Sequence, residues 1–181
     1  MTNVVSTGNS VVLGIGWEET DRTWSVSDSA GNTYTAQQKT NTATQIWGQT
    51  FYSVNVTGGN PLIITITNNT ASLSRFIKGA MLNMTNVTAF DAAGTAGTNN
   101  LGSSAPLVSG SYTTANNIEV LYTFAMNYVG ATGTPLVNFT EFYDVGGFSG
   151  QYRVTSASGL YLGTVTNSAD GSCIIFSGAF K

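Results

Sequence analysis

The sequence predicts an all-β protein, specifically an antiparallel, jelly-roll-like β-sandwich with about 11–12 short strands. Charged residues make up 8% of the chain and hydrophobic residues 41%, and Thr, Ser, Asn and Gly replace the missing charge, as is typical of β-rich proteins with neutral faces. No window keeps apolar residues at the spacing of a helix. Apolar or alternating runs recur about every ten residues between Gly- and Asn-containing turns.

The first half of the chain carries regular strand signals. The clearest turn lies at residues 28–34, Asp-Ser-Ala-Gly-Asn-Thr-Tyr, between two alternating runs. We interpret Asp28 as a turn-forming residue rather than a catalytic or metal-binding acid, because Asp caps turns through its own side chain. The expected strands are 11–17, 24–27, 33–39, 46–56, 62–67, 75–84 and 87–90.

Residues 91–106 are rich in Ala, Gly, Thr, Asn and Ser and carry no strand signal. They form either a linker between two domains or a loop that crosses between the two sheets of one sandwich. We favour the crossing loop, because neither half of the chain has enough predicted strands for two sheets of its own. The sequence therefore predicts a single domain over residues 1–181.

The second half contains a weak echo of the first. A polar turn at residues 7–9 leads into the apolar run 11–17, and a polar turn at 115–117 leads into the apolar run 118–125. Both runs are typical of central, buried strands. The further strands expected here are 136–144, 152–156, 161–166 and 173–180, the last of which contains the one cysteine, Cys173, as a small buried apolar residue.

Composition excludes several classes of function. Six Lys and Arg residues and a net charge of −3 do not supply the basic surface that nucleic acids or anionic membranes require. Histidine is absent, which removes Ser-His-Asp and Cys-His catalysis and the common zinc sites. No 18-residue apolar stretch and no signal peptide are present, so we expect a protein made in the cytoplasm that leaves the cell by lysis.

Carboxylates are the remaining candidates for chemistry. Glu18, Glu19 and Asp21 form an acidic loop after a strand, and could bind Ca²⁺ or simply be solvated beside Arg22. Glu141 and Asp144 lie in an aromatic strand, three residues apart, so regular alternation places them on opposite faces. We therefore predict no catalytic residue, no metal and no cofactor, and a protein that is not an enzyme.

Aromatic side chains offer a second kind of site. Trp47, Tyr52, Tyr143 and Tyr152 belong to clusters of aromatic residues, and rows of exposed aromatic rings on a sandwich face stack against sugars. The alternative is that these side chains pack in the core.

The neutral faces favour a third reading. Sheets with few charges lack the protection that keeps their edges from pairing with other chains. Such surfaces suit packing against copies of the same protein or against other subunits.

Three segments of the first half resemble a β-sandwich module of phage virion proteins that also occurs in bacterial surface proteins. They are residues 7–17 (TGNSVVLGIGW), 24–34 (WSVSDSAGNTY) and 52–60 (YSVNVTGGN), and the ending GAFK at 178–181 completes the series. The likeness spans nearly the whole chain in the same order. The family has no catalytic residue to transfer to this sequence.

This resemblance implies a non-enzymatic virion protein, a decoration or cement protein on the outer capsid surface. Its expected partners are the major capsid protein or other virion subunits and further copies of itself, with a trimer as the first guess. The alternative is a carbohydrate-binding module on a phage tail fibre or a bacterial surface, with a host-surface glycan as its ligand.

Overall fold

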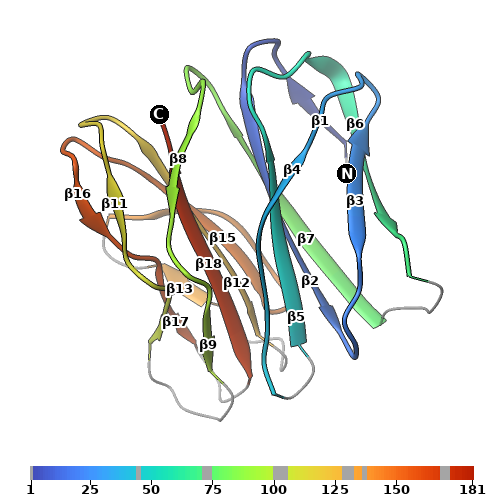
Figure 1. Ribbon diagram of the computed structural model, residues 1–181, viewed down its shortest axis with the longest axis vertical. Coiled ribbons are helices and arrows are strands. Elements are labelled where there is room, and N and C mark those ends of the chain that lie inside the picture. The colour runs from blue at the N-terminus through green and yellow to red at the C-terminus, as the bar shows by residue number, and fades with distance from the viewer. Residues whose placement is uncertain are drawn as a thin grey trace.

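A computed structural model of the protein describes residues 2–43, 46–70, 75–99, 106–127, 133–135, 138–167 and 172–181. The described residues form 18 strands and no helix, and every strand pair is antiparallel (Figure 1). The predicted all-β, antiparallel sandwich is confirmed. The structure divides the chain into more strands than the sequence pattern indicated.

The N-terminal half forms two sheets. The outer sheet has the order β1 (Thr2–Val5), β6 (Gly59–Asn68), β3 (Trp24–Asp28). The inner sheet has the order β4 (Thr35–Asn41), β5 (Ile46–Ser53), β2 (Ser10–Glu18), β7 (Arg75–Met84).

The C-terminal half repeats this division. Its inner sheet has the order β14 (Thr140–Val145), β15 (Phe148–Val154), β12 (Val120–Asn127), β18 (Cys173–Phe180), and β18 also pairs with β8 (Phe90–Ala93) and β9 (Gly97–Asn99). The outer layer consists of the pair β11 (Tyr112–Thr114) and β16 (Gly159–Tyr161) and of the sheet β10 (Leu107–Val108), β17 (Thr164–Asn167), β13 (Gly133–Pro135).

The two inner sheets pack face to face, and the outer layers cover their other faces (Figure 1). One core therefore lies between the inner sheets, and further cores lie beneath each outer layer. The inner strands β2, β12 and β18 are buried along nearly their whole length. This burial on both faces explains why their sequences are continuous apolar runs instead of alternating ones.

Each half contains the same seven-strand arrangement. The inner order β4-β5-β2-β7 corresponds to β14-β15-β12-β18. In the N-terminal outer layer β6 pairs with β1 and β3. In the C-terminal one β16 pairs with β11, and β17 pairs with β10 and β13, so that β16 and β17 together take the place of β6, and β10 and β11 together that of β1. The sequence pattern indicated a weak echo and not a true repeat, but the structure shows two similar units, and the two apolar runs of the echo are their central strands β2 and β12.

The strand registers show which residues are equivalent. The corresponding cross-strand rows are Thr35–Tyr52–Val12–Leu82 and Thr140–Tyr152–Tyr122–Gly178. A β-bulge follows each row at the same place. From residue 36 to residue 39, β4 advances by three residues while its partner β5 advances by two. From residue 141 to residue 144, β14 likewise advances by three residues while its partner β15 advances by two. A shared bulge is a strong sign of a common unit, since it depends on one extra residue at one position.

The inner sheets interlock because glycine on one faces a large side chain on the other. A Cβ atom at Gly14 would lie 2.5 Å from Cγ of Phe124, and one at Gly16 would overlap the sulfur of Met126. By the register, Gly14 and Phe124 are equivalent positions of the two halves. The interface therefore depends on a size difference between two otherwise similar units.

Residues 91–106 contain strands that the sequence did not indicate. Within the described part, 91–99 and 106, the chain forms most of β8 and all of β9 along the edge of β18. Its small residues allow close backbone contact, since a Cβ atom at Gly94 or Gly97 would overlap a carbonyl oxygen of the segment 108–110. The segments 90–93 and 97–99 are strands because they pair with β18, and not because of an alternating pattern in their own sequence. The predicted strand 136–144 begins at Thr140, and residues 136 and 137 lie outside the described part.

The interpretation of Asp28 as a turn former is confirmed. Its Oδ1 accepts hydrogen bonds from the amides of Ala30 (2.9 Å) and Asn32 (3.0 Å), and its Oδ2 accepts from Asn32 Nδ2 (2.8 Å) and the Tyr34 hydroxyl (2.9 Å). Burial acts to raise the pKa of Asp28, but these hydrogen bonds from Asn32, Tyr34 and Ala30 outweigh it and hold the pKa below its ordinary value.

We predict that Asp28→Asn lowers the free energy of unfolding by about 1–2 kcal/mol at neutral pH, allowing for the partial exposure of this carboxylate. Because the folded-state pKa is depressed, the ionised group stabilises the fold above its unfolded pKa, and this stability is lost as the pH falls through the folded pKa. Urea unfolding at neutral and acidic pH measures both effects. An equal loss of stability on acidification in the variant and the native protein would contradict the assignment.

We predict that Gly14→Ala destabilises the protein by about 1–3 kcal/mol, because the added methyl group forces Phe124 out of its position. The matched control is Gly159→Ala, since a Cβ atom there would meet only Tyr161 at 3.8 Å. Urea unfolding of both variants makes the comparison. Equal stabilities would show that the inner sheets do not interlock at Gly14.

Candidate functional site

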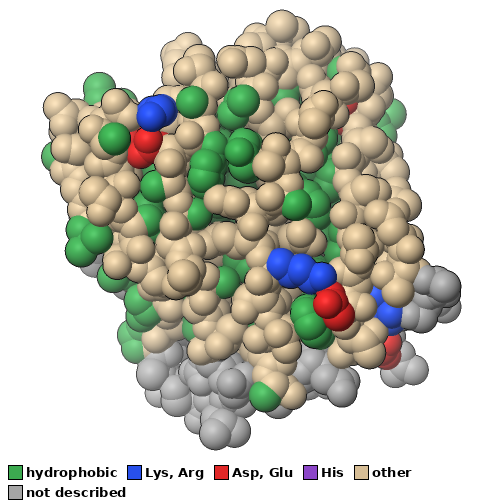
Figure 2. Space-filling model, in the orientation of Figure 1, with side chains coloured by type: hydrophobic (Ala, Val, Ile, Leu, Met, Phe, Trp, Pro, Cys, Tyr) green, Lys and Arg blue, Asp and Glu red, His purple; other side chains and the backbone are tan. Residues whose placement is uncertain are grey.

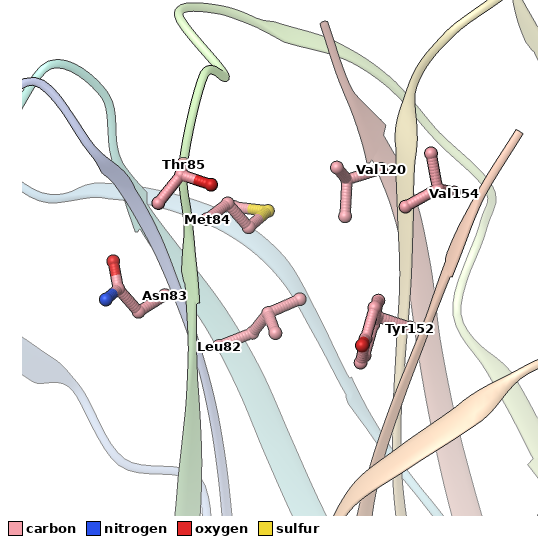
Figure 3. Close-up of a pocket in the computed structure, with 7 residues that line it drawn as sticks. All are labelled: Leu82, Asn83, Met84, Thr85, Val120, Tyr152 and Val154. Atoms are coloured by element: carbon pink, nitrogen blue, oxygen red, sulfur yellow. The ribbon is translucent and has the colours of Figure 1, made fainter.

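A groove opens between the two inner sheets, on the side where β7 lies near β15 (Figure 3). Its volume is about 330 Å³. We call it the seam groove and define it by its lining residues, Leu82, Asn83, Met84, Thr85, Val120, Tyr152 and Val154. Figure 3 shows Leu82, Met84 and Thr85 on one side of the gap and Val120, Tyr152 and Val154 on the other, while the side chain of Asn83 points away from the gap.

The seam groove continues the core between the inner sheets. Leu82 and Met84 belong to that core, and Val120 and Tyr152 pack against it. Val154 is 57% exposed, although the alternation of β15 turns it toward the same side as Tyr152. The groove therefore offers an apolar surface that is open to solvent and lined by no charged residue.

A smaller hollow of about 180 Å³ adjoins the seam groove and shares Thr85, Val120 and Val154 with it. Of its two charged lining residues, Lys181 forms an ion pair, whereas Glu119 is buried and accepts hydrogen bonds from neutral donors. Lys181 Nζ donates to Asp91 Oδ1 (2.9 Å), and Glu119 Oε1 accepts from the amide of Asn116 (2.8 Å). Burial acts to raise the pKa of Asp91, but hydrogen bonds from Lys181 and the Ala115 amide outweigh it and lower the pKa.

The aromatic candidates do not form one exposed row. Trp47 is half-buried, and its ring stacks on Trp17 at 6.3 Å in the core beneath the outer sheet. Tyr52 faces the opposite way, into the core between the inner sheets, where it stacks on Phe90 at 4.8 Å. Trp47 therefore lies apart from the other candidates.

Tyr143 and Tyr152 also pack against the core between the inner sheets. Tyr143 meets Phe148 edge-on, with ring centroids 6.2 Å apart. Tyr152 is the one aromatic candidate that lines the seam groove, and Figure 3 shows its ring facing the gap.

The acidic loop lies beside Trp47. Lys39 joins the two, because its ammonium group donates to Asp21 and lies 5.6 Å from the centre of the Trp47 ring. Arg22 lies 4.0 Å from the carboxylate of Glu19, and Glu18 ends β2. Basic side chains thus offset this acidic cluster, as expected for a solvated loop.

The expectation that Glu141 and Asp144 lie on opposite faces is wrong. Glu141 pairs with Gln151 and Asp144 with Ser149, two residues apart on β15, because the bulge inserts one extra residue between them. Both carboxylates therefore lie on the outer face of β14. Burial raises the pKa of Glu141, and the charge of Asp144 raises it further; burial also raises the pKa of Asp144.

Within the described ranges, no three or more His, Cys, Asp or Glu side chains come close enough to hold a metal ion. Cys173 is buried, as its sequence context indicated. Over the same part of the chain, no helix has the length and hydrophobicity required to span a membrane.

Comparison of the chain with protein-family models, curated proteins and solved structures finds no match. The resemblance to virion modules thus stays a prediction, and function must be inferred from the geometry of this chain alone.

Sequence reasoning found one residue of the seam groove, Tyr152, and missed the rest. Leu82 and Met84 were assigned correctly to a strand. Nothing in the local sequence of that strand, however, shows that the edges of the two inner sheets separate there and leave a groove. The groove joins segments about 40–70 residues apart in sequence, so that only the packing of the halves reveals it.

We predict that Asp144→Asn lowers the pKa of Glu141 toward its ordinary value, because it removes the neighbouring negative charge while burial remains. NMR titration of the Glu141 side chain measures this shift. Asp21→Asn, at the distant acidic loop, is the control and leaves the titration unchanged. An unchanged Glu141 titration in Asp144→Asn would place the two carboxylates on opposite faces after all.

Proposed function

We propose that the protein is a non-catalytic structural protein of a phage virion, which decorates the outer capsid surface and docks onto neighbouring subunits through the seam groove. The observation that carries the proposal is the seam groove itself, which is uncharged and partly apolar, has a volume of about 330 Å³, continues the core and is open to solvent. Surfaces of this kind mark sites of protein association.

The distribution of charge supports the same proposal. Figure 2 shows a face dominated by backbone and by side chains that are neither charged nor hydrophobic. On it the few basic side chains lie beside acidic ones, and apolar side chains gather between β8 and β4. Interfaces are depleted of charge at their centres. A neutral surface also removes the repulsion that keeps highly charged proteins apart.

The expected partners follow from this proposal. They are the major capsid protein or other virion subunits and further copies of the chain, the trimer being the first guess. The absence of catalysis likewise stays a prediction, since Glu141 and Asp144 share a face and thus meet one geometric requirement of carboxylate chemistry.

A carbohydrate-binding module is the second candidate, and one observation favours it. The ring of Tyr152 lines the seam groove together with the hydroxyl-bearing Thr85, a combination of stacking surface and hydrogen-bonding group that suits a sugar. A reproducible glycan-array signal that is lost in Tyr152→Ala and kept in Trp47→Ala would favour this function over capsid decoration.

Virion association tests the first proposal. Particles are banded on a density gradient from a lysate that contains the protein, and the copy number per particle is measured by mass spectrometry. We expect a fixed copy number for the native chain. Val154→Asp lowers it by at least about tenfold, because docking would bury an unpaired carboxylate in an apolar groove.

Val4→Asp is the matched control, since Val4 is 58% exposed and Val154 57%, and it leaves the copy number unchanged. A native protein that does not band with particles would contradict the virion assignment. Equal losses in the two variants would contradict the role of the groove.

A further inference from the structure

The two halves differ at one edge of their inner sheets. In the C-terminal half, β8 and β9 pair with the outer edge of β18. The equivalent strand of the N-terminal half is β7, which pairs only with β2 among the described residues. An unpaired strand edge presents free amide and carbonyl groups to a further strand.

The occupied edge shows how such a strand binds. Phe90 of β8 pairs with Phe180, and its ring packs between Tyr52 (4.8 Å, stacked) and Phe180 (5.3 Å, edge-on). Val54 and Phe90 both pack against the core between the inner sheets. A strand on this edge therefore closes the seam with one aromatic ring.

The seam groove is the counterpart of this Phe90 site. Equivalence by register relates Tyr52 to Tyr152, Phe180 to Met84 and Val54 to Val154. The three counterparts Tyr152, Met84 and Val154 all line the seam groove. Val54 is partly buried where β8 lies near it, whereas Val154 is 57% exposed. The same cradle thus occurs twice, filled on one side and open on the other.

We propose that the seam groove and the free edge of β7 bind an extended segment of a partner protein by β-strand addition, with an aromatic side chain of that segment in the groove. Main-chain hydrogen bonds to β7 supply affinity, and the groove selects the aromatic residue. The aromatic residue lies opposite Met84, as Phe90 lies opposite Phe180. By the same pairing, in which Asp91 is skipped, the second and third residues after the aromatic one lie opposite Asn83 and Leu82.

Two features define the chemistry of the segment. The stretch 79–84 of β7, Gly-Ala-Met-Leu-Asn-Met, carries no charge, so a neutral strand matches it. Leu82 stands where the other half has Gly178, whose missing side chain lets the carbonyl of Ala92 approach closely. The Leu82 side chain therefore fills space that is open at Gly178 in the Phe90 site, so the seam groove favours small residues after the aromatic residue of the bound segment.

This inference deepens the proposed function and rests on it for the source of the segment, a neighbouring virion subunit. Its binding site is tested without virions. The probe is the synthetic peptide VTAFNAAGT with capped ends, which is the sequence of residues 87–95 with Asn in place of Asp91 so that it is neutral. It contains β8, the strand that brings Phe90 to the edge of β18. It is titrated into the full chain, and the methyl groups of Leu82, Met84, Val120 and Val154 are followed by NMR.

We expect saturable shifts confined to these methyl groups and to the amides of β7. The same peptide with Ala in place of Phe binds at least about tenfold more weakly, because it lacks the aromatic anchor. Val154→Asp abolishes the shifts, and the matched variant Val4→Asp keeps them.

Absence of shifts up to about 1 mM peptide would overturn the inference, as would shifts at other sites or equal binding of the two peptides. Concentration-dependent shifts of the same groups without peptide would assign the edge to a second copy and would overturn the partner segment. If the protein bands with virions but does not bind the peptide, this inference is wrong and the proposed function is unaffected.

Discussion

The contact between the two inner sheets is the interaction on which the rest of the structure depends. Two units with the same strand order meet there, and they fit because Gly14 and Gly16 of one leave room for Phe124 and Met126 of the other. Packing of this kind is sensitive to single carbon atoms. It buries one face of β2 and β12 while the outer layers bury the other, which explains why these strands are nearly continuous apolar runs.

The connection between the units makes the two sides of this contact different. The segment that links them runs along β18 as β8 and β9, and Phe90 closes the seam on that side. No described strand does the same for β7. The open groove is therefore a consequence of tandem arrangement, because one linker can cover one edge. A protein built in this way has an open groove beside a strand edge that no described strand covers, without any dedicated loop or charged residue.

Much of the fold could be predicted from local signals. The Asp28 turn, the alternation of β3 and the apolar runs of β2 and β12 are encoded in a few neighbouring residues each, and they suffice for the fold class. The strands at 90–99 escaped notice because their pairing with β18, and no pattern of their own, defines them.

The candidate site was less predictable, for two physical reasons. A β-bulge shifted the alternation between Glu141 and Asp144, and one extra residue reverses any argument from strand parity. The seam groove forms where the edges of the two inner sheets meet, and which edges meet depends on contacts between residues far apart in the sequence. Tyr152 was recognised as an aromatic residue, but not as a wall of a groove shared with β7.

Amide hydrogen exchange along β7 and β18 tests the central claim, that equivalent strands differ because one edge is covered and the other is free. Both strands are bonded on one side to a central strand, β2 or β12. The account predicts slow exchange of successive amides of β18 over its pairing with β8 and β9, and fast exchange of every second amide of β7. Uniform protection along both strands would contradict it.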